Sequence, residues 1–137
     1  LIGLGVSAIG TVGATYSQSA ESLEEYYGHL DQGRLPVVRG LALNRDDLVR
    51  RAVIMALMCQ GELQFEPIDQ AWLIDSRKYF APELEQLETM AEQGLVVLNS
   101  ESIKVTAMGW FFVRGIAMVF DRYLQADRNR ARFSRII

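Results

Sequence analysis

The sequence predicts a mostly α (α+β) fold, in which a winged-helix-like helical domain with a small β-hairpin follows an N-terminal strand. Three observations support this prediction. A long apolar segment, Ala107 to Leu124, is typical of a buried helix. Amphipathic segments with capping residues precede it. Two short β-type segments joined by a polar turn lie directly before it.

The segment Ala107 to Leu124 is expected to form the core helix. A helix that is apolar around most of its surface is either buried in a protein or spans a membrane. Arg114 ends the unbroken apolar run, which is shorter than the roughly 20 residues that a span needs. We therefore expect burial and no membrane partner. Two adjoining faces carry the apolar side chains: Phe112, Ile116, Val119 and Tyr123, and Val113, Ala117, Phe120 and Leu124.

The composition fits one folded domain of a longer, cytoplasmic protein. Half of the 137 residues are hydrophobic, which is enough to build a core. The net charge of −3 argues against a nucleic-acid partner. The chain opens without an initiator methionine or a recognisable export signal, so we expect it to be part of a longer cytoplasmic chain.

The single cysteine and the single histidine limit the chemistry of this chain. One thiol cannot form an internal disulfide, and zinc and iron–sulfur sites need several ligands. No metal site is therefore expected within the chain. Cys59 is expected to be a small core residue, and His29 a surface residue.

The N-terminal segment Leu1 to Ile9 is apolar with small residues between, which predicts a buried strand. Residues 3–8 also match the G-x-G-x-x-A variant of the dinucleotide-binding fingerprint. That fingerprint needs a strand before it and a helix directly after it, and this context is missing. The alternative is a strand whose glycines allow another group to approach the backbone closely.

Capping residues and apolar spacing place the remaining elements. Ser22 followed by Glu25 forms a capping box, and Asn44 is a second candidate N-cap. The predicted elements are a helix from Ser19 to Gly33, an extended connector from Leu35 to Leu43, a helix from Asn44 to about Cys59, a short helix from Pro67 to Leu73, a helix from Asp75 or Ser76 to Gln93, and β segments at Leu95 to Leu98 and Ser102 to Thr106.

This order of helices and hairpin is that of a winged-helix unit, which commonly places its third helix in DNA. Here the third helix is acidic, so it would repel phosphates. We therefore interpret the unit as a packing module. Its acidic residues are Glu83, Glu85, Glu88 and Glu92.

The C-terminal tail differs in charge from the rest of the chain. Residues 122–137 hold five arginines and one acidic residue, whereas the first 121 residues hold 9 basic and 16 acidic residues and so carry −7. One interpretation is a solvated chain end. The other is a segment that presents guanidinium groups to an anionic ligand. The arginines concerned are Arg128, Arg130, Arg132 and Arg135.

Several segments together resemble one family along nearly the whole chain. They are GLGVSAIG, EEYYGHLDQG, RGLALNRDDLVRRAVIMALMC, VTAMGWFFVRGIAMVFDRYL and the closing FSRII. The chain resembles the C-terminal part of the oxygen-independent coproporphyrinogen III oxidases, which are radical S-adenosylmethionine enzymes. The resemblance implies a partial TIM-type barrel followed by a helical domain. Residues 1–18 would then be an orphaned terminal strand and loop of the missing barrel, and residues 19–137 the helical C-terminal domain with its basic tail.

The resemblance also implies a reaction, in which two propionates of coproporphyrinogen III are oxidatively decarboxylated to give protoporphyrinogen IX during haem synthesis. The family's cofactors are S-adenosylmethionine and a four-iron four-sulfur cluster held by a C-x-x-x-C-x-x-C motif, which is absent here. The intact parent would be the enzyme, and this chain alone is expected to bind no cofactor and to be inactive.

One site residue follows from the resemblance: Ile9 corresponds to the isoleucine that contacts S-adenosylmethionine. Gly3 and Gly5 would then be glycines of a cofactor-facing strand, and the fingerprint match a coincidence. The four tail arginines named above are a hypothesis for binding the substrate's propionates. No catalytic residue is expected in this chain.

The expected partners are the missing barrel of the same chain and coproporphyrinogen III. We expect the parent to be a monomer, and the isolated chain to self-associate through its exposed strand. The alternative function is a non-enzymatic binding module, either a haem-chaperone C-terminal domain or a winged-helix interaction domain.

Overall fold

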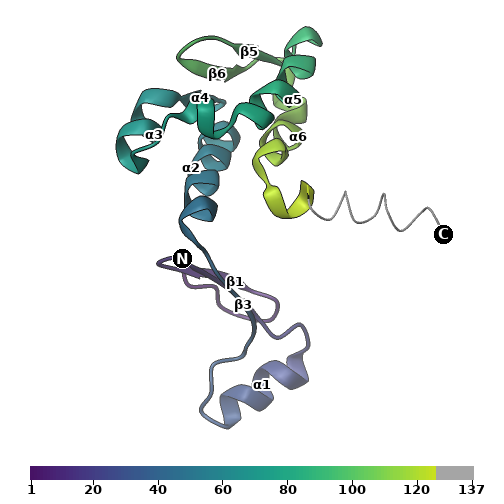
Figure 1. Ribbon diagram of the computed structural model, residues 1–137. Helices are drawn as coiled ribbons and strands as arrows, with labels where there is room; N and C mark the ends of the chain where they lie inside the picture. The colour runs from purple at the N-terminus through teal and green to yellow at the C-terminus, as the bar shows by residue number, and fades with distance from the viewer. Residues whose placement is uncertain (126–137) are drawn as a thin grey trace, which may run out of the picture. The chain divides into compact units, whose positions relative to one another are not determined.

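A computed structural model describes residues 1–125 of the chain, and Figure 1 gives the course of its elements. The chain divides into two compact units, Leu1–Leu48 and a second that begins at Val49. The structure is mixed α/β, with small sheets and short helices. Within residues 1–125, no helix has the length and apolar character needed to cross a membrane.

The first unit is built on a three-stranded antiparallel sheet in the order β1-β2-β3, so that β2 is the central strand. A tight turn at Gly13, whose φ of 56° lies in the left-handed region, joins β1 to β2. Along the chain, helix α1 follows β2 and precedes β3 (Figure 1). The elements are β1 (Ile9–Val12), β2 (Thr15–Ser19), α1 (Leu23–Asp31) and β3 (Val37–Ala42).

Two sequence-based predictions for this unit are corrected. The strand predicted over Leu1 to Ile9 begins only at Ile9, because positive φ angles at Gly5 (99°) and Ser7 (60°) turn the preceding backbone. The predicted connector from Leu35 to Leu43 contains β3. Pro36 lies just before β3, so its missing N–H does not interrupt the ladder.

Helix α1 confirms the predicted cap. The Ser22 hydroxyl accepts a hydrogen bond from the Glu25 amide at 3.2 Å, which satisfies a free donor of the first turn. The helix is shorter than predicted at its start, because Ser19 belongs to β2. The predicted domain boundary between residues 18 and 19 therefore runs through a strand, and the assignment of residues 1–18 to a barrel stays a prediction.

The second unit packs helices against a second antiparallel sheet, in the order β4-β6-β5. The predicted hairpin is confirmed as β5 and β6, while β4 was not predicted. The first residues of α2 are counted with the first unit. The elements are α2 (Arg45–Gln60), β4 (Glu62–Gln64), α3 (Phe65–Trp72), α4 (Ser76–Tyr79), α5 (Ala81–Glu92), β5 (Val96–Leu98) and β6 (Ser102–Val105).

The caps at the starts of α2 and α4 are the ones that the sequence predicted. Asn44 and Asp47 exchange two backbone-to-side-chain hydrogen bonds of 2.9 Å, a reciprocal box that fixes the start of α2. Asp75 accepts from the Lys78 amide at 3.2 Å at the start of α4.

The helix predicted from Asp75 to Gln93 is two helices. Its break is at Phe80, and Pro82 lies in the first turn of α5, where a missing N–H costs nothing.

The single core helix predicted over Ala107 to Leu124 is wrong. The segment forms 3₁₀ turn η1 (Gly109–Phe112), helix α6 (Val113–Ala117) and 3₁₀ turn η2 (Met118–Phe120). A Cβ atom at Gly109 would lie 1.9 Å from the Leu95 carbonyl oxygen, so this backbone packs directly on its neighbour.

The change of helical period also changes which residues are buried. In a 3₁₀ turn, residues three apart are eclipsed, so a pattern with a 3.6-residue period no longer selects one face. Phe111 and Phe112 are exposed, whereas the half that follows contributes to the core. That core comprises Val49, Val53, Leu57, Leu63, Phe65, Phe80, Leu87, Val96, Ile103, Ile116, Ala117, Val119 and Phe120.

Arg50 joins three elements of the second unit. Its Nη1 donates to Glu83 Oε1 at 2.7 Å and to the Phe120 carbonyl oxygen at 3.1 Å. The guanidinium carbon also lies 5.5 Å from the centroid of the Phe80 ring. The side chains of Arg50 and Glu83 are only 16% and 12% exposed, so this pair is largely shielded from water. It connects α2, α5 and η2 across the core.

Replacing Arg50 by methionine should lower the free energy of unfolding by about 3 kcal/mol, because it leaves the Glu83 carboxylate buried without its charge partner. The double variant R50M/E83Q should recover part of this loss. Urea unfolding measures both. Lys104→Gln is the control, since its pair with Glu62 is more exposed and worth about 0–1 kcal/mol. A loss in R50M no larger than that in K104Q would contradict the account.

Asp75 should make stability depend on pH. Hydrogen bonds from Lys78 hold the pKa of the Asp75 carboxyl below its ordinary value. A carboxyl whose pKa is lowered by folding stabilises the protein above its unfolded pKa, and this contribution is lost as pH falls through the folded pKa. The difference in unfolding free energy between wild type and Asp75→Asn, which keeps a cap, should therefore shrink below about pH 4. A difference that stays constant down to pH 2 would contradict this assignment.

Candidate functional site

The register of the first sheet places six side chains on one face. Directly paired residues of antiparallel strands point to the same side, and residues two apart along a strand do so too. Two rows cross the three strands: Ile9, Gln18 and Arg39, and next to them Thr11, Tyr16 and Leu41. The sheet thus gathers an apolar group, an amide, a phenol and a guanidinium on one surface.

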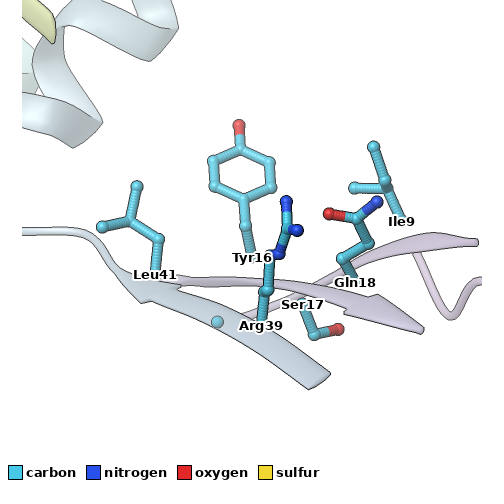
Figure 2. Close-up of a pocket in the computed structure, with 7 residues that line it drawn as sticks. Ile9, Tyr16, Ser17, Gln18, Arg39 and Leu41 are labelled. Carbon is cyan, nitrogen blue, oxygen red and sulfur yellow. The ribbon is translucent and has the colours of Figure 1, made fainter. Parts of the chain in front are cut away.

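This face forms an open groove of about 440 Å³. Figure 2 shows Ile9, Tyr16, Arg39 and Leu41 extending to the same side of the sheet, with Ser17 on the opposite side. Ile9 is 60% exposed, so its side chain is available for an apolar contact. The groove is therefore a shallow surface, apolar along much of its floor and cationic at Arg39.

A carboxylate of the chain already lies beside two of these groups. Glu21 Oε1 accepts a hydrogen bond from Gln18 Nε2 at 3.3 Å and lies 3.7 Å from Arg39 Nη2. The side chains of Arg39 and Glu21 are 72% and 58% exposed. An ion pair so open to solvent contributes little to stability, about 0–1 kcal/mol.

Residues 1–8 support the strand that carries Ile9. The Thr11 amide donates to the Leu1 carbonyl oxygen at 2.7 Å, and the Gly5 amide donates to the Tyr26 hydroxyl at 3.2 Å. Gly3 lies against the backbone of Ile9, since a Cβ atom there would be 2.7 Å from the Ile9 carbonyl oxygen. Gly3 and Gly5 are thus in the segment before β1, and the prediction that they belong to a strand is wrong.

Cys59 and four tail arginines were also singled out by the sequence. Cys59 is exposed, which corrects its prediction as a core residue. Arg128, Arg130, Arg132 and Arg135 lie outside the described residues. Within residues 1–125, no three His, Cys, Asp or Glu side chains are grouped closely enough to hold a metal ion.

Ile9 was predicted as a site residue, and the residues around it were not. Tyr16, Gln18 and Arg39 escaped because β2 was not predicted and β3 was read as a connector after Pro36. A signal was present: TYSQS and VVRGLA each contain the β-branched or aromatic residues that favour strands.

Comparisons with known proteins match large parts of the chain or all of it. The sequence model described as the HemN C-terminal domain matches residues 43–112. An oxygen-independent coproporphyrinogen III oxidase from Pseudomonas aeruginosa is 49% identical over 137 residues, which are 100% of this chain and 30% of the relative. The enzyme of the same name from Escherichia coli is 41% identical with the same coverage.

A solved structure agrees with the sequence matches. It is described as "Coproporphyrinogen III oxidase (HemN) from Escherichia coli is a Radical SAM enzyme", and it is similar to this chain with a TM-score of 0.83 and 42% identity. The match covers 88% of this chain and 28% of that one. The chain therefore spans less than a third of the length of these relatives.

Gly3→Ala should loosen the support of Ile9, because its Cβ would meet backbone atoms that cannot move aside cheaply. We expect faster hydrogen exchange at the Thr11 amide, which donates to Leu1. The matched control is Gly28→Ala in α1, where a Cβ meets nothing within 4 Å and alanine is favoured by up to about 1 kcal/mol. Equal Thr11 exchange in both variants would refute this role of Gly3.

Proposed function

Because this chain belongs to the HemN C-terminal domain family, we propose that it is the C-terminal part of an oxygen-independent coproporphyrinogen III oxidase. The observation that carries the proposal is the 49% identity to such an enzyme across all 137 residues, which includes the face around Ile9 as well as the second unit. Residues 1–18 would complete the barrel of the whole protein, and residues 19–137 would form its helical domain.

The proposed reaction is the oxidative decarboxylation of two propionate side chains of coproporphyrinogen III to vinyl groups, in the cytoplasm. S-Adenosylmethionine with a four-iron four-sulfur cluster would supply the oxidising radical. The one cysteine of this chain cannot provide the thiolates of a cluster, so cluster ligands belong to the rest of the whole protein. The chain alone is accordingly proposed to be inactive.

The role proposed for the first unit is to form part of the wall of the cofactor site. Ile9 would offer its exposed side chain as an apolar contact to S-adenosylmethionine. The antiparallel pairing of β1 with β2, and the backbone of residues 1–3 beside β1, would hold that side chain in place. In this role the first unit would orient the ligand through the apolar contact at Ile9.

The role proposed for the second unit is to pack against the rest of the polypeptide and to cover the active site. Its order of β4, α3, α4, α5, β5 and β6 is consistent with a winged-helix-like arrangement. Helix α5 carries Glu83, Glu85, Glu88 and Glu92, which favours contact with protein over contact with nucleic acid. The proposed partner is the remainder of the same polypeptide.

The complete protein should convert coproporphyrinogen III anaerobically to protoporphyrinogen IX and carbon dioxide, with reductant present to start the reaction. For each vinyl group formed, one S-adenosylmethionine should be consumed as the two-electron oxidant and leave as methionine and 5′-deoxyadenosine. Product formation, followed by chromatography of the oxidised porphyrins, measures this directly. A complete protein with an intact cluster that binds haem stoichiometrically but converts no porphyrinogen would instead support the non-enzymatic, haem-chaperone function.

The four tail arginines remain a proposed substrate contact. Replacing Arg128, Arg130, Arg132 and Arg135 by glutamine in the complete protein should raise the KM for coproporphyrinogen III by about tenfold or more, since charge-assisted hydrogen bonds to propionates are lost. Cleavage of S-adenosylmethionine should change less. An unchanged KM together with a lower melting temperature would make the tail a structural element.

A further inference from the structure

We infer that Arg39, with Gln18 beside it, is a carboxylate-binding position of the face that carries Ile9, and that Glu21 occupies this position when no ligand is bound. The identity of the ligand rests on the proposed function. The position itself rests on the register of the sheet, the groove on its face and the contacts of Glu21.

The register puts Arg39 within reach of a ligand that touches Ile9. Ile9 is paired with Gln18, and Gln18 is paired with Arg39, so the three residues form one row across the sheet. Neighbouring strands are about 4.8 Å apart, which places the backbones of Ile9 and Arg39 about 10 Å apart. A small organic ligand can therefore contact the isoleucine with one end and the guanidinium with the other.

The contacts of Glu21 show that two donors of this row converge on a carboxylate. Gln18 Nε2 and Arg39 Nη2 lie 3.3 and 3.7 Å from the same atom, Glu21 Oε1. At 3.7 Å the guanidinium is beyond ordinary hydrogen-bond length, so Arg39 retains donor capacity. Both members of the pair are more than half exposed, so a ligand carboxylate can displace Glu21 at small cost.

Arginine suits this task because its planar fork donates two parallel hydrogen bonds to a carboxylate, which lysine cannot do. Tyr16 and Leu41 occupy the adjoining row and extend to the same side of the sheet (Figure 2). They offer a bound ligand apolar surface beside the guanidinium, and a ligand that covers this surface would shield its own ion pair with Arg39 from water.

Two ligands of the proposed enzyme carry the required group. S-Adenosylmethionine has the carboxylate of its amino-acid part, and coproporphyrinogen III has four propionates. The chemistry recognised by Arg39 is the same in both cases. The experiment therefore measures the two ligands separately.

The test uses the complete protein with its cluster, in wild-type form and as Arg39→Gln, Arg39→Lys, Glu21→Gln and Arg34→Gln. Arg34 is the matched control, an exposed arginine of the same unit that lies outside the strands and pairs with Gln32. Equilibrium dialysis gives the Kd for S-adenosylmethionine, and initial rates give the KM for coproporphyrinogen III. Circular dichroism melting verifies that each variant folds.

R39Q removes the guanidinium fork and should raise either the Kd for S-adenosylmethionine or the KM for coproporphyrinogen III by about ten- to a hundredfold. R39K should be intermediate, because it keeps the charge without the paired donors. E21Q should lower the same constant, because it removes the competing carboxylate, and R34Q should leave both unchanged. A rise in the Kd identifies S-adenosylmethionine as the source of the carboxylate, and a rise in the KM identifies the propionates.

The inference is overturned if both constants are unchanged in a folded R39Q protein, or if R34Q raises the same constant equally. In those cases a wild-type enzyme that still converts coproporphyrinogen III leaves the proposed function intact. A wild-type protein that binds neither ligand contradicts the proposed function, and the inference fails with it.

Discussion

The pairing of β2 with both of its neighbours is the constraint on which the first unit and its candidate site depend. Side chains of a sheet alternate between its faces, so a shift of one residue would move Gln18 and Tyr16 to the opposite side. The register is shifted only between Gln18 and Ser19, at the end of β2, where the chain leaves the sheet toward α1. Pairing resumes beyond the bulge between Ser19 and Val37, and the rows of the candidate site, which lie on the other side of the bulge, keep their register.

The second unit relies on a different kind of constraint. Helices α3, α4 and α6 are short, and short helices in water are stabilised mainly by packing. The buried core supplies most of that packing, and the Arg50–Glu83 pair adds directional contacts among α2, α5 and η2. Because Arg50 also donates to the Phe120 carbonyl oxygen, the end of η2 keeps a partner where no regular helical bond is available.

The sequence predicted best those features that depend on local chemistry. The caps at Ser22, Asn44 and Asp75, and the hairpin of β5 and β6, follow from side chains that bond to nearby backbone. Predictions from the sequence failed where tertiary contacts determine the structure of a segment. Gly109 packs against Leu95 near the start of the segment that was predicted to be one helix, and nothing in the local sequence reveals that contact.

The candidate site shows the same division. Ile9 was predicted from a resemblance, whereas Gln18 and Arg39 became candidates only when the pairing of three strands placed them in its row. Residues 30 positions apart in the chain cannot be recognised as neighbours from spacing alone. The polar residues of the candidate site could therefore be found only from the fold, whereas its apolar residue was predicted from the resemblance to a family.

The central proposal is that the β1-β2-β3 face lines the ligand site of a larger enzyme. Hydrogen-exchange mass spectrometry of the complete protein, with and without S-adenosylmethionine and coproporphyrin, tests it most directly. The account predicts slower exchange on ligand binding in peptides covering residues 9–18 and 37–42, with smaller changes in β4, β5 and β6. Protection confined to residues 49–125, with no change in the first sheet, would contradict it.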